Sequence, residues 1–253
     1  MAKAMTGLLE GKTAFVTGGG AGLGLAILKG FAAAGARGCA FDLVPPPRPL
    51  PAGWDYRAGD VREEASLAGA LAAVKDKLGR LDILVANAGV VPPWHDSEAI
   101  DLGEWDDVFA VKVRGVAATI KQGVPLMKAA GGSIIAMASV SAREGHPRQA
   151  TYVASKHAVL GITRATALDV GRFGIRVNAL CPGPVATQAL LDRLRDRAEQ
   201  GISSEKEALR RYGQTALGRM ATVEDVAGAA LFLASSLSSG VTGQAIVVDA
   251  GAG

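Results

Sequence analysis

The chain has 253 residues, 49% of them hydrophobic, which predicts one α/β domain over residues 1–253 with a large buried core. Its 27 basic and 24 acidic residues leave a net charge of only +3, without a basic cluster, which argues against a nucleic-acid partner. The N-terminal segment lacks the apolar core of a signal peptide, and no uncharged run is long enough to cross a membrane, so we expect a cytoplasmic protein without a membrane partner. Cys39 and Cys181 lie in apolar runs, and the three histidines are scattered, so no metal site is expected.

A glycine-rich turn joins the first predicted strand, residues 12–16, to the first predicted helix, residues 23–34. It is the stretch TGGGAGLG, which starts at Thr17. Such a turn brings backbone N–H groups to a pyrophosphate at the N-terminus of the helix. The glycines that shape it are Gly18, Gly22 and Gly24. The alternative is a plain strand-to-helix turn that binds nothing.

An aspartate, Asp42, lies at the end of the second predicted strand, residues 37–43, about 20 residues beyond the glycine turn. A carboxylate at this point of a dinucleotide-binding unit accepts hydrogen bonds from the adenosine ribose and repels a 2′-phosphate. The turn residues Gly19, Gly20 and Ala21 offer no basic side chain to an extra phosphate. Asp42 therefore favours NAD over NADP, with a surface aspartate as the alternative.

The rest of the chain alternates predicted strands and helices. Residues 45–53 contain five prolines, which predicts an extended crossover instead of a helix. The further predicted elements are the strand 54–58, the helix 63–78, the strand 81–86, the helix 102–129, the strand 133–139, the helix 150–172, the strand 175–180, a helix from Thr222 to about Ser235 and the strand 244–249. This alternation predicts a doubly wound parallel sheet with helices on both faces. A polar helical region over about 186–214 is expected to cover the substrate, and its Arg-rich segment 193–211 is interpreted as a solvated face.

Tyr152 and Lys156 are the candidate reacting pair. They are four residues apart on a predicted helix, so their side chains share one face. A nearby ammonium favours the phenolate and moves the tyrosine pKa towards the pH at which a general acid or base works best. Ser139 ends the preceding strand and can hydrogen-bond the same substrate oxygen. This spacing is common by chance on helices, so the pair alone favours a purely structural role.

Several motifs in order make the chain resemble the short-chain dehydrogenase/reductase family over essentially its whole length. They are T-G-x-x-x-G-x-G at Thr17–Gly24, N-A-G at Asn87–Gly89, a serine upstream of Y-x-x-x-K at Tyr152–Lys156, N-x-x-x-P-G at Asn178–Gly183, and V-T-G-Q at Val241–Gln244. The resemblance implies a Rossmann sheet of seven strands in the order 3-2-1-4-5-6-7. It also implies NAD(P)-dependent redox chemistry on an alcohol or carbonyl group, and a homotetramer or homodimer.

The resemblance also assigns roles to individual residues. Tyr152 is the acid/base, Lys156 holds the nicotinamide ribose and lowers the Tyr152 pKa, and Ser139 orients the substrate oxygen. Asp60 and Val61 meet the adenine. The other implied cofactor contacts are Gly18, Gly22, Leu23, Gly24, Asp42, Asn87, Ala88, Gly89, Pro182, Gly183, Val185 and Thr187.

Two features depart from the family pattern. The proline-rich crossover replaces a helix beside the adenine. Lys112 stands where the family usually has a catalytic asparagine that anchors a water in a proton relay. Our hypothesis is that Lys112 either rebuilds this relay as an ammonium donor or leaves proton release to bulk water, and that like charges lower the pKa of Lys112 or Lys156. A lysine that points to solvent is the alternative.

The sequence thus predicts an enzyme that transfers a hydride between NAD and a secondary alcohol or ketone. The alternatives are an NADH-dependent carbonyl reductase or dehydratase-like relative, and a catalytically weakened NAD-sensing protein. The substrate would lie between the loops 90–97 and 140–149 and the region 186–214. Polar side chains there, such as Trp94 and Arg148, leave both a carboxylate-bearing substrate and an apolar cyclic alcohol open.

Overall fold

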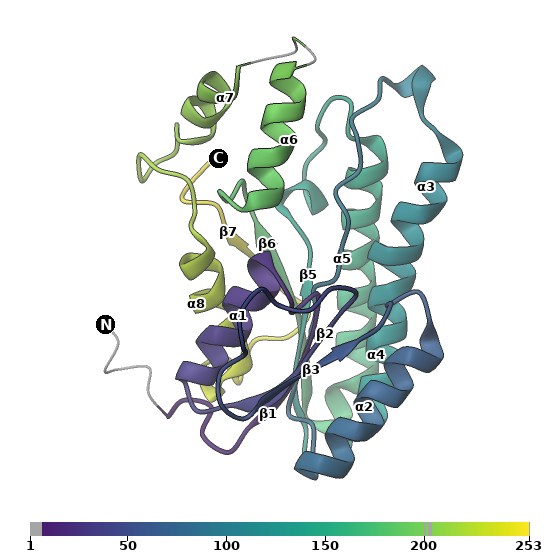
Figure 1. Ribbon diagram of the computed structural model, residues 1–253. Coiled ribbons are helices and arrows are strands. Elements are labelled where there is room, and N and C mark those ends of the chain that lie inside the picture. The colour runs from purple at the N-terminus through teal and green to yellow at the C-terminus, as the bar shows by residue number, and fades with distance from the viewer. Residues whose placement is uncertain (1–6, 200, 202–203, 253) are drawn as a thin grey trace.

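One parallel sheet of seven strands runs through the molecule (Figure 1). The computed structural model describes residues 7–199, 201 and 204–252. The strands are β1 (Thr13–Thr17), β2 (Arg37–Asp42), β3 (Trp54–Ala58), β4 (Ile83–Ala86), β5 (Gly132–Met137), β6 (Ile175–Pro182) and β7 (Ala245–Val248). Their order is β3-β2-β1-β4-β5-β6-β7 and every neighbouring pair is parallel, which confirms the predicted doubly wound sheet.

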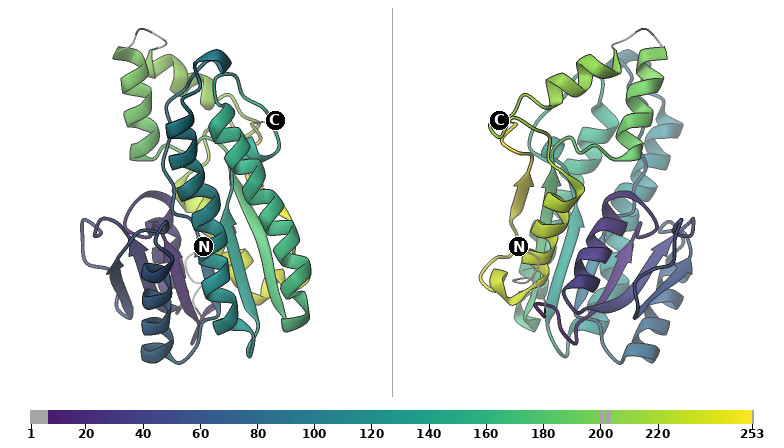
Figure 2. Two further views of the ribbon diagram at one scale, coloured as in Figure 1. Left: turned by 90° about the vertical axis from the view of Figure 1, so that its right-hand side faces the viewer. Right: turned by 60° about the vertical axis from the view of Figure 1, so that its left-hand side comes forward.

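Helices cover both faces of this sheet (Figures 1 and 2). On one face lie α1 (Gly22–Ala33) and α8 (Val223–Ala234). On the other lie α2 (Glu64–Leu78), α4 (Gly115–Met127) and α5 (Ala150–Val170), with α3 (Leu102–Phe109) leading into α4. Two short helices, α6 (Gln188–Glu199) and α7 (Glu205–Tyr212), stand beyond one end of the sheet.

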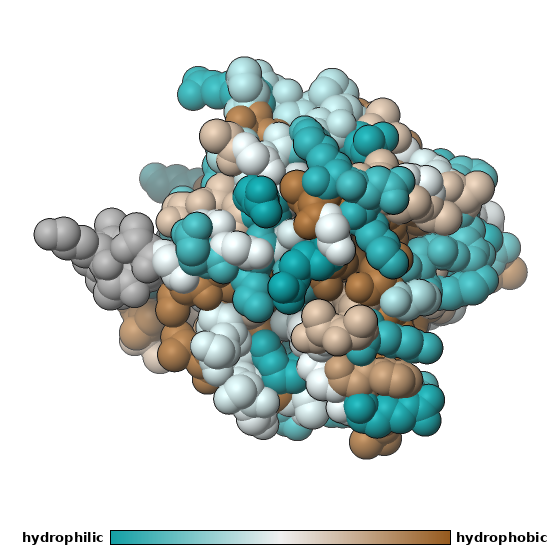
Figure 3. Space-filling model, turned by 90° about the horizontal axis from the view of Figure 1, so that it is seen from below, coloured by the Kyte–Doolittle hydropathy of each residue, from teal (hydrophilic) through white to brown (hydrophobic). Residues whose placement is uncertain are grey.

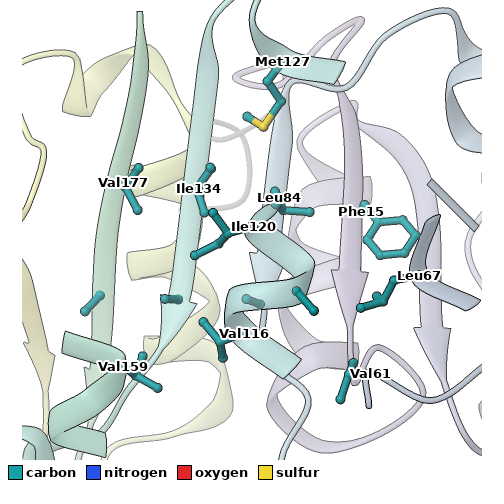
Figure 4. Close-up of a cluster of buried hydrophobic side chains, with 14 of the residues drawn as sticks. Phe15, Val61, Leu67, Leu84, Val116, Ile120, Met127, Ile134, Val159 and Val177 are labelled. Carbon is teal, nitrogen blue, oxygen red and sulfur yellow. The ribbon is translucent and has the colours of Figure 1, made fainter. Parts of the chain in front are cut away.

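The core is split into two layers by the sheet. Successive strand residues point to opposite faces, so Ile134 belongs to the layer under α2, α4 and α5, whereas Ile135 belongs to the layer under α1 and α8. Figure 4 shows the first layer, in which Ile120 of α4 packs against strand side chains. The strand residues labelled there are Phe15, Leu84, Ile134 and Val177. Burial on both faces explains why the strands are continuous apolar runs.

Figure 3 shows the end of the molecule opposite α6 and α7, where polar and apolar residues are mixed over the surface. None of the helices in the described part of the chain is both long and apolar enough to cross a membrane.

The proline-rich crossover lacks a helix, as predicted. Residues 45–53 contain no helix, and the chain passes directly from β2 to β3. Trp54, at the start of β3, is buried and takes part in the layer under α1 and α8. Its indole N–H donates a hydrogen bond of 3.0 Å to the carbonyl of Ala36. The Trp54 side chain thus covers a part of this face of the sheet that a crossover helix would otherwise cover.

The predicted helix over 102–129 is interrupted. Between α3 and α4 the chain forms one π-helical turn, Ala110–Arg114, which contains an extra residue and therefore changes the direction of the side chains within it. The turn buries Lys112, which regular α-helical periodicity does not predict. Smaller differences occur at strand ends. β5 ends at Met137 because Ser139 starts a tight turn, in which its hydroxyl accepts a hydrogen bond from the N–H of Ser141.

The helix α1 approaches the end of β1 as closely as backbone atoms allow. A Cβ atom on Gly24 would lie 2.0 Å from the carbonyl oxygen of Gly18 and 2.5 Å from the amide nitrogen of Asn87. No side chain larger than hydrogen fits in this space. The glycine turn therefore keeps its shape only while position 24 is glycine.

We predict that Gly24→Ala destabilises the fold by about 1–3 kcal/mol or more, because the new methyl group overlaps backbone atoms. The matched control is Gly69→Ala in α2, where a Cβ meets nothing within 4 Å. There the substitution should stabilise by about 0.5–1 kcal/mol through higher helix propensity. Denaturant unfolding of both variants measures the difference. Equal stabilities would contradict the close-packing argument.

Candidate active site

A cleft of about 670 Å³ opens at the carboxyl ends of the central strands. Its volume lies within the range of about 300–1,000 Å³ typical of small-molecule and cofactor sites. Gly18 follows β1, Asp42 ends β2, Asn87 follows β4, Ser139 follows β5 and Pro182 ends β6, and all five residues line this cleft. The fold thus brings together residues that are far apart in sequence. They meet at the carboxyl ends of the parallel strands, which is where doubly wound sheets bind ligands.

The glycine turn and Asp42 form one end of the cleft. Gly18 and Gly22 adopt positive φ angles of 65° and 51°, which glycine accepts without strain. The N–H of Gly20 donates a hydrogen bond of 2.9 Å to Oδ2 of Asp42. This bond holds the carboxylate beside the turn. Together these backbone groups and the carboxylate fit the pyrophosphate and ribose of a dinucleotide.

Asn87 and Thr17 brace the turn from beneath. The side-chain amide of Asn87 donates hydrogen bonds of 3.1 Å to the carbonyl oxygens of both Thr17 and Gly18. In return, the hydroxyl of Thr17 accepts hydrogen bonds from the backbone N–H groups of Asn87 and Ala88. Both donors of the Asn87 amide are thus engaged by the turn. Asn87 therefore positions the glycine turn in addition to lining the cleft.

A charge pair that the sequence motifs do not predict lies at the rim of the cleft near β3. Asp60 and Val61 line the cleft as expected, and Arg62 lies beside them. The guanidinium of Arg62 pairs with the carboxylate of Asp60 at 2.7 Å, and hydrogen bonding from Arg62 lowers the pKa of Asp60. This basic side chain is therefore already neutralised. Its sequence signal was the spacing D-x-R directly after β3.

Ser139, Tyr152 and Lys156 come together at the other end of the cleft. The ammonium of Lys156 donates a hydrogen bond of 2.6 Å to the carbonyl of Met137 and lies 5.8 Å from the centre of the Tyr152 ring. Burial lowers the pKa of Lys156 to about 8. Burial also raises the pKa of Tyr152, an effect opposed by the Ser139 hydroxyl and by the positive charge of Arg193.

Lys112 reaches the same place from the π-helical turn. Only 5% of its surface is exposed, so the interpretation of a lysine that points to solvent is wrong. Its ammonium nitrogen lies 4.9 Å from the centre of the Tyr152 ring, and the position that a Cβ of Gly89 would occupy is 3.0 Å from it. Burial first, and then repulsion from Lys156 and Arg193, lowers the pKa of Lys112 well below its usual range.

Most of the predicted cofactor residues line the cleft. They are Gly18, Gly22, Leu23, Asp42, Asp60, Val61, Asn87, Ala88, Gly89, Pro182, Gly183 and Thr187. Gly24 and Val185 do not. Gly24 packs α1 against the turn, and Val185 is buried and forms a β-bridge with Ala221.

The Arg-rich segment differs from its interpretation as a solvated face. Arg193 and Arg197 of α6 are half-buried, with their guanidinium carbons 5.6 Å and 4.1 Å from the centre of the Trp94 ring. Arg195, between them, is exposed and pairs with Asp192. The reason is helical spacing, which turns residues four apart towards the loop 90–97 and the intervening arginine away from it.

Comparisons with known proteins identify the family of this chain. The family model described as "Enoyl-(Acyl carrier protein) reductase" matches residues 18–253. "Short-chain dehydrogenase reductase 4" of Arabidopsis thaliana is 37% identical, over 98% of this chain and 86% of that protein. The D-beta-hydroxybutyrate dehydrogenase of Rhizobium meliloti (strain 1021) is 34% identical, over 95% of this chain and 98% of that protein.

A solved structure extends the likeness to three dimensions. The carveol dehydrogenase of Mycobacterium avium, in complex with NAD, superimposes with a TM-score of 0.88 at 31% identity, over 98% of this chain and 99% of that one. The family, the sheet order and the convergence of the motif residues in one cleft all agree. The chain therefore belongs to the short-chain dehydrogenase/reductase family of oxidoreductases.

Proposed function

We propose that this protein oxidises a secondary alcohol to a ketone with NAD, or reduces the ketone with NADH, and that Tyr152 is the acid/base. The observation that carries the proposal is that one cleft has Asp42 and the glycine turn at one end and Ser139, Tyr152 and Lys156 at the other. NAD, when bound, supplies the hydride acceptor. A relative that acts on hydroxybutyrate and a structural neighbour that acts on carveol support a CH–OH substrate.

The residues of this chain would provide positioning and proton transfer. The Tyr152 oxygen takes the hydroxyl proton of the alcohol as the hydride leaves its carbon, and returns it in the reverse direction. The Ser139 hydroxyl orients the same substrate oxygen. Lys156, fixed by the Met137 carbonyl, presents its ammonium beside the phenol and to the nicotinamide ribose. Burial of Tyr152 makes its phenolate costly, so nearby positive charges are needed to stabilise it.

Lys112 is proposed to replace the relay asparagine as an uncharged amine. An ammonium only donates hydrogen bonds, but a neutral amine also accepts them, as the amide oxygen of asparagine does. The burial of Lys112 and the positive charges of Lys156 and Arg193 favour the neutral form. A neutral amine against Gly89 could therefore hold a water molecule beside the reacting groups.

Tyr152→Phe should lower kcat by about 100-fold or more, because general acid–base catalysis is typically worth that much. NADH binding should persist, since only one hydroxyl is removed. Absorbance at 340 nm with a panel of secondary alcohols and ketones measures turnover, and fluorescence titration measures binding. Cofactor binding by the unmodified protein without turnover of any substrate would instead favour the NAD-sensing role.

Asp42→Asn tests the cofactor preference. The asparagine carbonyl can still accept the hydrogen bond from Gly20, so the turn keeps its shape while the negative charge is lost. We expect the ratio of NADPH to NADH dissociation constants to fall by about 10- to 100-fold, because repulsion of the 2′-phosphate and a charge-assisted ribose contact are both removed. If the unmodified protein binds both cofactors equally well, the preference for NAD is wrong.

Lys112→Asn tests the amine relay. Below its pKa Lys112 is charged and cannot accept a hydrogen bond, so activity should fall as the pH falls through that pKa. This limb of the kcat profile should be absent from the asparagine variant. The control is Lys121→Asn in α4, where the exposed lysine pairs with Glu64. Identical profiles for the unmodified protein and Lys112→Asn would show that position 112 has no part in the relay.

A further inference from the structure

A cluster of arginines adjoins the cleft without lining it. Gln188 and Ala189 of α6 line the cleft, as do Val90 and Val91 of the loop that carries Trp94. Arg193 and Arg197, one turn apart on α6, both stack on Trp94. Burial is the main cause of the lowered pKa of Arg197, and the like charges of Arg211, Arg193 and Arg148 add to it. Four arginines from three segments are thus held close enough to repel one another. Such an arrangement is unfavourable unless an anion completes it.

Three guanidinium nitrogens in this cluster lack a hydrogen-bond partner among the described residues, namely Nε of Arg148, Nε of Arg193 and Nη1 of Arg197. All three nitrogens are shielded from solvent. Among residues 7–199, 201 and 204–252, neither Arg193 nor Arg197 forms an ion pair with a carboxylate, whereas Asp96 on the facing loop pairs with Arg148 at 3.4 Å. A buried donor without an acceptor is costly, which points to an acceptor that comes from outside the chain.

The geometry of the stacked pair favours a carboxylate as this acceptor. Contact with the Trp94 face restrains the guanidinium groups, and the N–H groups at their edges remain available as a fork for two oxygens. Arginine matches the planar, bidentate geometry of carboxylates better than lysine does. An apolar alcohol would leave both guanidinium groups unpaired.

The cluster is also close to the reacting groups. The positive charge of Arg193 acts on both Tyr152 and Lys112. We infer that the substrate is a hydroxy acid or keto acid, whose carboxylate is bound by Arg193 and Arg197 beside Trp94 while its hydroxyl or carbonyl group meets Tyr152. This inference rests on the proposed function and names the substrate class of that site. It selects the carboxylate-bearing class from the two that the sequence leaves open.

Dead-end ligands test the carboxylate site without turnover. Calorimetric titration of the protein, with NADH present and with it omitted, compares cyclohexanecarboxylate with cyclohexanecarboxamide and butanoate with butanamide. Each acid should bind about tenfold or more tightly than its amide, because a charge-assisted hydrogen bond is lost in the amide. The ratio of amide to acid dissociation constants should approach one in Arg193→Gln and in Arg197→Gln.

Arg195→Gln is the matched control, because Arg195 lies on the same helix but is exposed and pairs with Asp192 at 3.1 Å. It should leave the ratio of amide to acid dissociation constants unchanged. Arg197→Lys, which keeps the charge but loses the fork, should reduce the ratio only in part. Thermal unfolding checks that each variant is folded.

Three outcomes would overturn the inference. The first is equal binding of acids and amides, and the second is no detectable binding of the acids at millimolar concentration. The third is an equal loss of acid and amide binding in Arg197→Gln, because this result would mean that the stacked arginines only attach α6 to the loop. Failure of the proposed function is recognised separately, as absence of hydride transfer to any alcohol. Preference for acids over amides in the dead-end titration does not depend on that transfer.

Discussion

The close approach of α1 to the end of β1 is the constraint on which the rest of the site depends. Gly24 lets the helix backbone reach Gly18, and the amide of Asn87 then ties the turn to the end of β4. The same turn supplies the N–H of Gly20 that holds Asp42. One steric condition in α1 therefore sets the positions of groups on three neighbouring strands.

The opposite end of the cleft is governed by charge instead of steric fit. The buried phenol of Tyr152 lies near three basic side chains, those of Lys112, Lys156 and Arg193. Within the described part of the chain, no carboxylate forms an ion pair with any of the three. Burial lowers the pKa of both lysines, and at Lys112 the like charges of Lys156 and Arg193 add to this effect. A site that takes up and releases protons near neutral pH, and that attracts negative charge, is the consequence of this arrangement.

The sequence was sufficient for the features that depend on local chemistry. The continuous apolar runs around Phe15, Leu84 and Ile134 predicted strands buried on both faces, and the prolines of 45–53 predicted a crossover without a helix. The features that it did not predict depend on tertiary packing. Helical periodicity could not place Lys112 inside, because a π-helical turn has a different period. The burial of Arg193 and Arg197 could not be predicted because Trp94 is distant in sequence and charged helices are usually solvated.

The two ends of the cleft rest on different parts of the fold. The end at Tyr152 rests on α5 and the π-helical turn, which pack against the same core layer as α4. The end at Asp42 and Asp60 adjoins the crossover 45–53, which contains no helix. A change of length over 45–53 is therefore expected to leave the position of Tyr152 unchanged. Cofactor preference and reaction chemistry are in this way open to separate selection.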